Sequence, residues 1–73
     1  MKKSVLLFFS ASIYPEEKVI QAISEYKGIC HIKLVRKNGG FECAFFESVA
    51  DLELTAMEFA NYLIELVNTG GQG

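Results

Sequence analysis

The spacing of apolar residues along the chain predicts three strands and two helices. Residues 5–11 open with an unbroken apolar run, VLLFF, typical of a strand whose faces or edge become covered. Apolar residues then alternate with their neighbours from Cys30 to Leu34, which is the period of a half-buried strand. The segment RKNGGFE contains Asn38-Gly39, a strong hairpin signal, and residues 41–47 follow it as a third strand.

A helix is predicted between the first two strands, beginning at Pro15. Proline is favoured at the first helical position, and Glu16 and Glu17 complement the positive end of the helix dipole. Apolar residues recur at helical spacing over residues 19–26, so this helix should cover one face of a sheet. We expect Gly28 to end it.

A second helix is predicted over residues 52–67, capped by Ser48 or Asp51 and ended by NTGGQG. Its apolar residues form two adjoining stripes: Leu52, Ala56, Phe59, Leu63 and Leu66, and beside them Met57, Ala60, Ile64 and Val67. The solvent side is expected at Glu53, Thr55, Glu58, Asn61, Tyr62, Glu65 and Asn68. Because a surface helix normally buries a stripe of a little over about 100°, the extra apolar width needs a partner beyond the chain's own sheet.

The order β-α-β-β-α predicts an α+β fold, a two-layer sandwich with both helices on one face of a three-stranded sheet. A right-handed crossover through the first helix makes strands one and two parallel, and strand three inserts between them, giving the order 1-3-2. This is a ferredoxin-like unit that lacks its last strand. We expect one domain over residues 1–68 and a flexible C-terminal tail over residues 69–73.

This topology leaves the first strand at the margin of the sheet with unpaired backbone groups, a hazard that natural sheets usually cover or pair. We therefore predict a non-catalytic accessory or interaction module that docks through this strand and the wide helix face. The partner is expected to be a protein: a second copy in a homodimer, a peptide, or a peptide-modifying enzyme. The candidate interface residues are Leu6, Phe8, Tyr14, Phe59, Asn61 and Tyr62.

Composition supports a small folded domain. The chain has 73 residues, of which 51% are hydrophobic, and a domain of this size is only marginally stable alone. The opening MKKSVLLFFSAS is similar to a secretory signal, but its apolar run is shorter than the roughly 7 to 15 residues of a signal core, so we favour a strand. No run approaches a membrane span, and we expect a cytoplasmic protein with no membrane partner.

Charge is divided unevenly between the two halves. All seven Lys and Arg residues lie in residues 1–37 beside three acids, for a charge of +4, whereas residues 38–73 hold six acids and no base, for −6. We expect the two halves to attract each other in the folded domain, in preference to a role in binding polyanions.

Few side chains in the sequence are candidates for catalysis or metal binding. The hairpin register pairs Leu34 with Cys43 and leaves Cys30 nearer Glu47, out of reach of a disulfide, so two free, mostly buried thiols are expected. His31 is expected to be a solvent-facing strand residue without a catalytic relay. We predict no catalytic residues, no metal ligands and no cofactor.

Nucleic-acid binding is the alternative function. The order of elements, with GGFECAFF on the third strand, is similar to the RNA-recognition motif, which places aromatic residues on its open sheet face. Gly40, Phe41 and Phe46 fit that pattern, whereas Glu42 and Cys43 do not. Glu42 at the expected platform and the net negative charge of the chain argue against the alternative, a weak single-stranded nucleic-acid-binding domain.

Three further stretches carry a family resemblance: SIYPEEKVIQAISEY at the first helix, the strand CHIKL with its hairpin, and EFANYLIEL in the last helix. In the last of these, Phe59, Asn61 and Leu63 match a Phe-x-Asn-x-Leu pattern. Over residues 12–66 the chain resembles the small D-type accessory protein of the His-Xaa-Ser peptide-modification systems. That family typically continues with a basic segment, where this chain has VNTGGQG. The resemblance implies an accessory or carrier-like protein encoded beside radical-SAM enzymes that modify a peptide.

Overall fold

The computed structural model describes residues 3–70, which form three strands and two helices in the predicted order. The elements are β1 (Val5–Ser10), α1 (Glu16–Glu25), β2 (His31–Lys37), β3 (Gly40–Phe46) and α2 (Leu52–Gly70). The strands make one sheet in the order β1-β3-β2, and β3 is antiparallel to both neighbours. The predicted α+β fold and strand order are confirmed.

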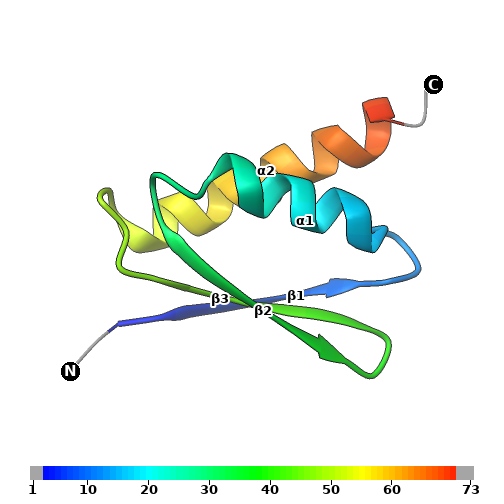
Figure 1. Ribbon diagram of the computed structural model, residues 1–73, viewed down its shortest axis with the longest axis horizontal. Helices are drawn as coiled ribbons and strands as arrows, with labels where there is room; N and C mark the ends of the chain where they lie inside the picture. The colour runs from blue at the N-terminus through cyan, green and yellow to red at the C-terminus, as the bar shows by residue number, and fades with distance from the viewer. Residues whose placement is uncertain (1–2, 71–73) are drawn as a thin grey trace.

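The molecule has two layers, with the sheet in one layer and both helices on the same face of it (Figure 1). α2 packs against α1, β1 and β3. The opposite face of the sheet carries no helix among the described elements (Figure 1). The sheet therefore has one face covered by the helices and one face that no described helix covers.

The core between the layers is built around Phe59 of α2. Its ring lies 5.0 Å from that of Phe45, 5.9 Å from that of Phe9 and 5.4 Å from that of Tyr26, measured between centroids. Edge-on and tilted aromatic pairs at these separations add to the free energy of apolar burial. One side chain thus joins α2 to β1, β3 and α1.

Two details of α1 differ from the sequence prediction. Pro15 lies one position before the first helical residue, in an extended conformation, so it is the residue preceding the helix rather than its first member. The helix ends at Glu25, three residues before Gly28, where the Tyr26 N–H is shared between the carbonyls of Ala22 and Ile23. Gly28 lies in the turn that follows and is not the stop signal.

The structure decides between the two predicted caps of α2. The Asp51 carboxylate accepts a hydrogen bond from the Leu54 N–H at 2.9 Å, so Asp51 is the N-terminal cap. Ser48 Oγ instead lies 3.2 Å from Thr55 Oγ1. This contact lets Thr55 be buried, so the prediction that it faces solvent is wrong.

α2 is longer than predicted and continues to Gly70. Residues 69 and 70 therefore belong to the helix rather than to a tail. The rest of the predicted tail, residues 71–73, lies outside the described residues.

The hairpin between β2 and β3 has the predicted register, with Leu34 opposite Cys43. Gly39 has a φ of 84°, in the left-handed region where glycine has no steric penalty. The next residue, Gly40, is buried where β3 meets β1. A Cβ on Gly40 would lie 2.3 Å from the backbone oxygen of Phe9 and 2.6 Å from the ring of Phe8.

We predict that Gly40→Ala destabilises the domain by about 1–3 kcal/mol, because the backbone of β1 would have to move away from the added methyl group. Gly28→Ala is the matched control, since a Cβ there has no atom within 4 Å, and its free energy of unfolding should change by less than about 0.5 kcal/mol. Urea denaturation of both variants at one protein concentration measures the difference. Equal stabilities would contradict the close packing at Gly40.

Candidate functional site

The outer edge of β1 carries unpaired backbone groups. β1 is an edge strand, paired with β3 on one side and with no other described strand. The Ala11 N–H donates to the Gly39 carbonyl at 2.9 Å, and the backbone groups of successive strand residues point to opposite sides. The N–H and C=O groups of Leu6 and Phe8 therefore point away from β3, where an added strand would bind them.

The apolar stripe of α2 that the core does not use lies beside this edge. The Tyr62 ring lies 5.9 Å, between centroids, from that of Tyr26, the residue directly after α1, and this fixes the flank of α2 that faces α1. Ala60 and Ile64 each lie two residues from Tyr62, about 200° around the helix, so they are on the opposite flank. Because α2 packs on β1, that flank lies on the β1 side of the domain.

We call this flank the outer α2 stripe, and it consists of Met57, Ala60, Ile64 and Val67. Met57 is 63% exposed and Ile64 is 42% exposed, while the other two are partly buried. The stripe and the outer edge of β1 together form the β1 edge surface. A strand added at this surface would hydrogen-bond to β1 and place alternate side chains under the stripe.

Three of the predicted interface residues are accessible. Leu6 is 59% exposed and Phe8 is 56% exposed, both on the open face of β1. Asn61 is exposed on α2. These positions are compatible with a contact surface, and their role stays a prediction.

The other three predicted interface residues contribute to internal packing. Phe59 is completely buried at the centre of the core, so the prediction that it forms an interface is wrong. Tyr14 is half-buried, with its ring 5.3 Å from that of Phe9. Tyr62, expected on the solvent side, is half-buried against Tyr26, whose pKa is raised by burial first and then by Glu58 and Tyr62.

The predicted interface residues did not include Met57 and Ile64, which are the most exposed members of the outer α2 stripe. Their signal was present in the sequence as a second apolar stripe at spacings of three and four residues. Choosing between the two stripes requires knowing which one faces the sheet. Only the packing of Phe59 supplies that information.

The thiols are poorly placed for nucleophilic chemistry. Cys43 is fully buried, and burial raises its pKa to about 11. The Cys30 Sγ donates to the backbone carbonyls of His31 and Phe46, at 3.4 Å and 3.5 Å. Both thiols are therefore buried, whereas reactive cysteines are accessible.

His31 lies on the opposite face of the sheet from both thiols. Its Nδ1 atom is 2.7 Å from Glu47 Oε1, and its ring lies 5.5 Å from that of Phe46. This exposed position confirms the prediction of a solvent-facing histidine. Within residues 3–70 no group of three or more His, Cys, Asp or Glu side chains could hold a metal ion.

The sheet differs from an RNA-binding platform at two residues, Phe41 and Glu42. Phe41 pairs with Phe9 and is buried toward the helices, so it cannot stack on a base. Glu42 lies on the open face, where it is 3.7 Å from Lys37. The sequence pattern that placed Phe41 on an RNA platform is therefore wrong about its direction.

Within residues 3–70, two exposed ion pairs link the oppositely charged halves. Lys37 with Glu42 and His31 with Glu47 join residues from the two halves, whereas Arg36 pairs with Glu16 inside the basic half. Exposed pairs of this kind contribute little to stability. Neither described helix is long and apolar enough to cross a membrane.

Comparison of the chain with family models, curated proteins and solved structures finds no match.

We predict that the Cys43 thiol makes stability depend on alkaline pH. Its pKa is raised from 9.0 to about 11 in the folded state, so its contribution is complete below pH 9 and is lost as the pH rises to about 11. The difference in unfolding free energy between the native chain and Cys43→Ala should shrink over this range. Parallel curves for the two proteins would contradict the burial of the thiol, because lysines and tyrosines titrate equally in both.

Proposed function

We propose that this chain is a small non-catalytic interaction module of the cytoplasm that pairs through its β1 edge surface. One observation carries the proposal: the free backbone edge of β1 lies beside the apolar outer α2 stripe, and the described residues leave both accessible. Strand addition supplies main-chain hydrogen bonds, and the stripe supplies apolar area. No step of this function needs a cofactor.

Covering this surface would also stabilise the domain. Burial of a large apolar side chain such as Met57 or Ile64 contributes about 1.5–3 kcal/mol relative to leaving it exposed. A domain of 73 residues has a small core, so these contributions are a large fraction of its stability. Partner binding and folding stability are therefore coupled.

A second copy of the chain is the partner that fits this surface best. β1 has no charged side chain, so two β1 edges can pair without repulsion between like charges. A two-fold axis perpendicular to the sheet would make the pair antiparallel and bring both α2 helices together on one face. The outer stripes have spacings of three, four and three residues, which suits packing of one helix against another.

The resemblance to the D-type accessory protein of His-Xaa-Ser systems is consistent with this function. The motifs EFANYLIEL and SIYPEEKVIQAISEY lie on α2 and at the start of α1, which build the helical layer. An accessory protein of a peptide-modifying enzyme needs a surface for an enzyme or a peptide rather than a catalytic centre. The same β1 edge would serve a strand from either partner.

We predict a homodimer at micromolar concentration that Ile64→Lys dissociates. The lysine would place two charges against the apolar seam, and loss of two buried isoleucines should raise the dissociation constant by at least about tenfold. Leu54→Lys is the matched control, because Leu54 is an exposed apolar residue of α2 outside the outer stripe. Sedimentation velocity over a concentration series measures both variants.

Two outcomes would contradict the dimer. A native chain that stays monomeric throughout the series, without binding an apolar dye, would remove the need for any partner at this surface. Equal dissociation by Ile64→Lys and Leu54→Lys would show that the outer stripe is not the contact. Circular dichroism of both variants checks that each remains folded.

Nucleic-acid binding has less support, since Phe41 faces the core and Glu42 occupies the open face. We expect labelled single-stranded RNA to show no salt-dependent binding that Lys33→Ala weakens. Fluorescence anisotropy at low and physiological salt measures this. Binding that weakens both with salt and with this substitution would favour the RNA function.

A further inference from the structure

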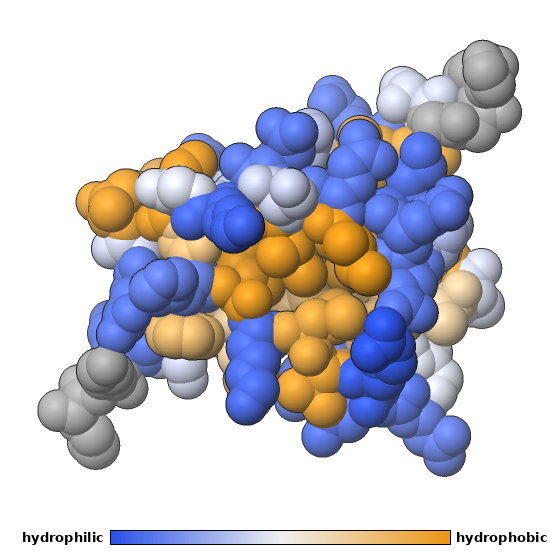
Figure 2. Space-filling model, viewed as in Figure 1, coloured by the Kyte–Doolittle hydropathy of each residue, from blue (hydrophilic) through white to orange (hydrophobic). Residues whose placement is uncertain are grey.

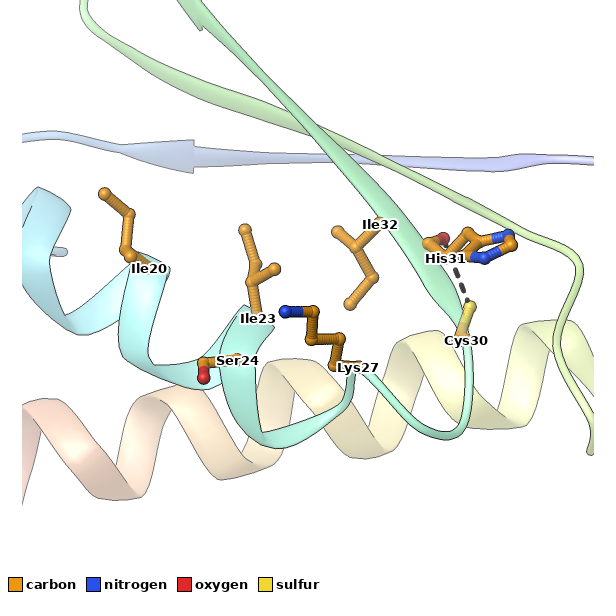
Figure 3. Close-up of a pocket in the computed structure, with 7 residues that line it drawn as sticks. All are labelled: Ile20, Ile23, Ser24, Lys27, Cys30, His31 and Ile32. Carbon is orange, nitrogen blue, oxygen red and sulfur yellow. Dashed lines mark hydrogen bonds between the residues drawn. The ribbon is translucent and has the colours of Figure 1, made fainter.

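A second surface lies on the other side of the domain, between α1 and β2. A groove of about 370 Å³ is lined there by Ile20, Ile23, Ser24, Lys27, Cys30, His31 and Ile32. Figure 2 shows apolar surface in the middle of this face, with hydrophilic residues around it. In Figure 3, Ile20 and Ile23 reach from α1 toward the strand that carries Ile32. The groove is therefore an apolar channel between a helix and an edge strand.

The strand that borders this groove also has free backbone groups. β2 is the second edge of the sheet and pairs only with β3 among the described strands. The N–H and C=O groups of successive strand residues point to opposite sides, as in β1. Those of the even-numbered residues of β3 therefore point toward β2. These residues pair with the odd-numbered residues of β2, so the N–H and C=O groups of Ile32 and Leu34 point to solvent along the groove.

The charged side chain that lines the groove is that of Lys27. On β2, Lys33 and Lys37 lie on the open face of the sheet, away from the groove. Arg36 pairs with Glu16, which joins the far end of β2 to the start of α1. Lys27 extends its amine between Ile23 and Ile32, as Figure 3 shows, and within residues 3–70 it makes no ion pair. An occupant with a carboxylate near Lys27 would complement this charge.

We propose that the groove between α1 and β2 binds an extended acidic peptide segment, with apolar side chains at alternate positions and a carboxylate against Lys27. The peptide extends the sheet at Ile32 and Leu34, and its apolar side chains enter the groove against Ile20 and Ile23. This site is separate from the β1 edge surface and does not depend on the proposed dimer. In a dimer through β1, the two grooves would lie at the outer ends of the sheet.

Charge distinguishes this occupant from a second copy of the chain. Pairing two β2 strands would bring their basic side chains together. A β1 strand from another copy has no carboxylate to offer Lys27. Neither edge of this chain therefore complements the groove as well as an acidic strand does.

The probe is a fluorescein-labelled peptide with valine at every second position, serine between the valines, and glutamate at both ends. We expect fluorescence anisotropy to show saturable binding. Lys27→Glu should weaken this binding by about three- to tenfold, because the ion pair with the peptide's glutamate is lost and two carboxylates then repel each other. Lys18→Glu is the matched control, since it changes the net charge equally and Lys18 does not line the groove. The same peptide with lysine in place of glutamate should prefer the Lys27→Glu variant.

Two further measurements test the binding mode without risk to folding. Methylation of the peptide's backbone nitrogens should abolish binding, because strand addition needs its N–H groups. Amide chemical shifts should change along Ile32 and Leu34 rather than along Leu6 and Phe8. Equal weakening by Lys27→Glu and Lys18→Glu, retained binding of the methylated peptide, or shift changes at β1 would each overturn the proposal. Shift changes at β2 on raising the protein concentration alone would assign the groove to a second copy and overturn it too.

Discussion

The packing of Phe59 against the sheet is the contact on which the rest of the structure depends. Its ring meets Phe9 of β1, Phe45 of β3 and Tyr26 of α1, so one side chain ties α2 to three other elements. These contacts fix the rotation of α2 about its own axis. Once Phe59 points into the core, Ile64 must lie on the flank away from α1. The exposed apolar stripe is therefore a direct consequence of how the core is filled.

Within residues 3–70 the sheet has two edges that no further strand covers, and the side chains along these two edges differ in character. β1 is apolar and uncharged, and it lies beside an apolar helix flank, which suits a symmetric contact between identical chains. β2 is basic and borders the groove below α1, which suits an acidic strand. The three described strands thus leave two separate edges, one for each of the two contacts that we propose. A fourth strand of its own would have covered the first edge.

The same packing separates the two thiols from the imidazole of His31. Cys43 is buried in the core with a raised pKa, and the Cys30 thiol donates to backbone carbonyls. His31 is on the other face of the sheet, beside Glu47. A thiol and an imidazole that lie on opposite faces cannot form a nucleophile and its base.

The sequence by itself determined the order of the elements, the hairpin register and the surplus apolar width of α2. Each of these is recorded in local spacing: alternation in strands, the Asn38-Gly39 turn, and two stripes on one helix. Only the tertiary structure decided which stripe is buried, that Thr55 and Phe59 are core residues, and that a groove separates α1 from β2. Periodicity defines the faces of an element but not their partners, because a face is buried only when another element packs against it.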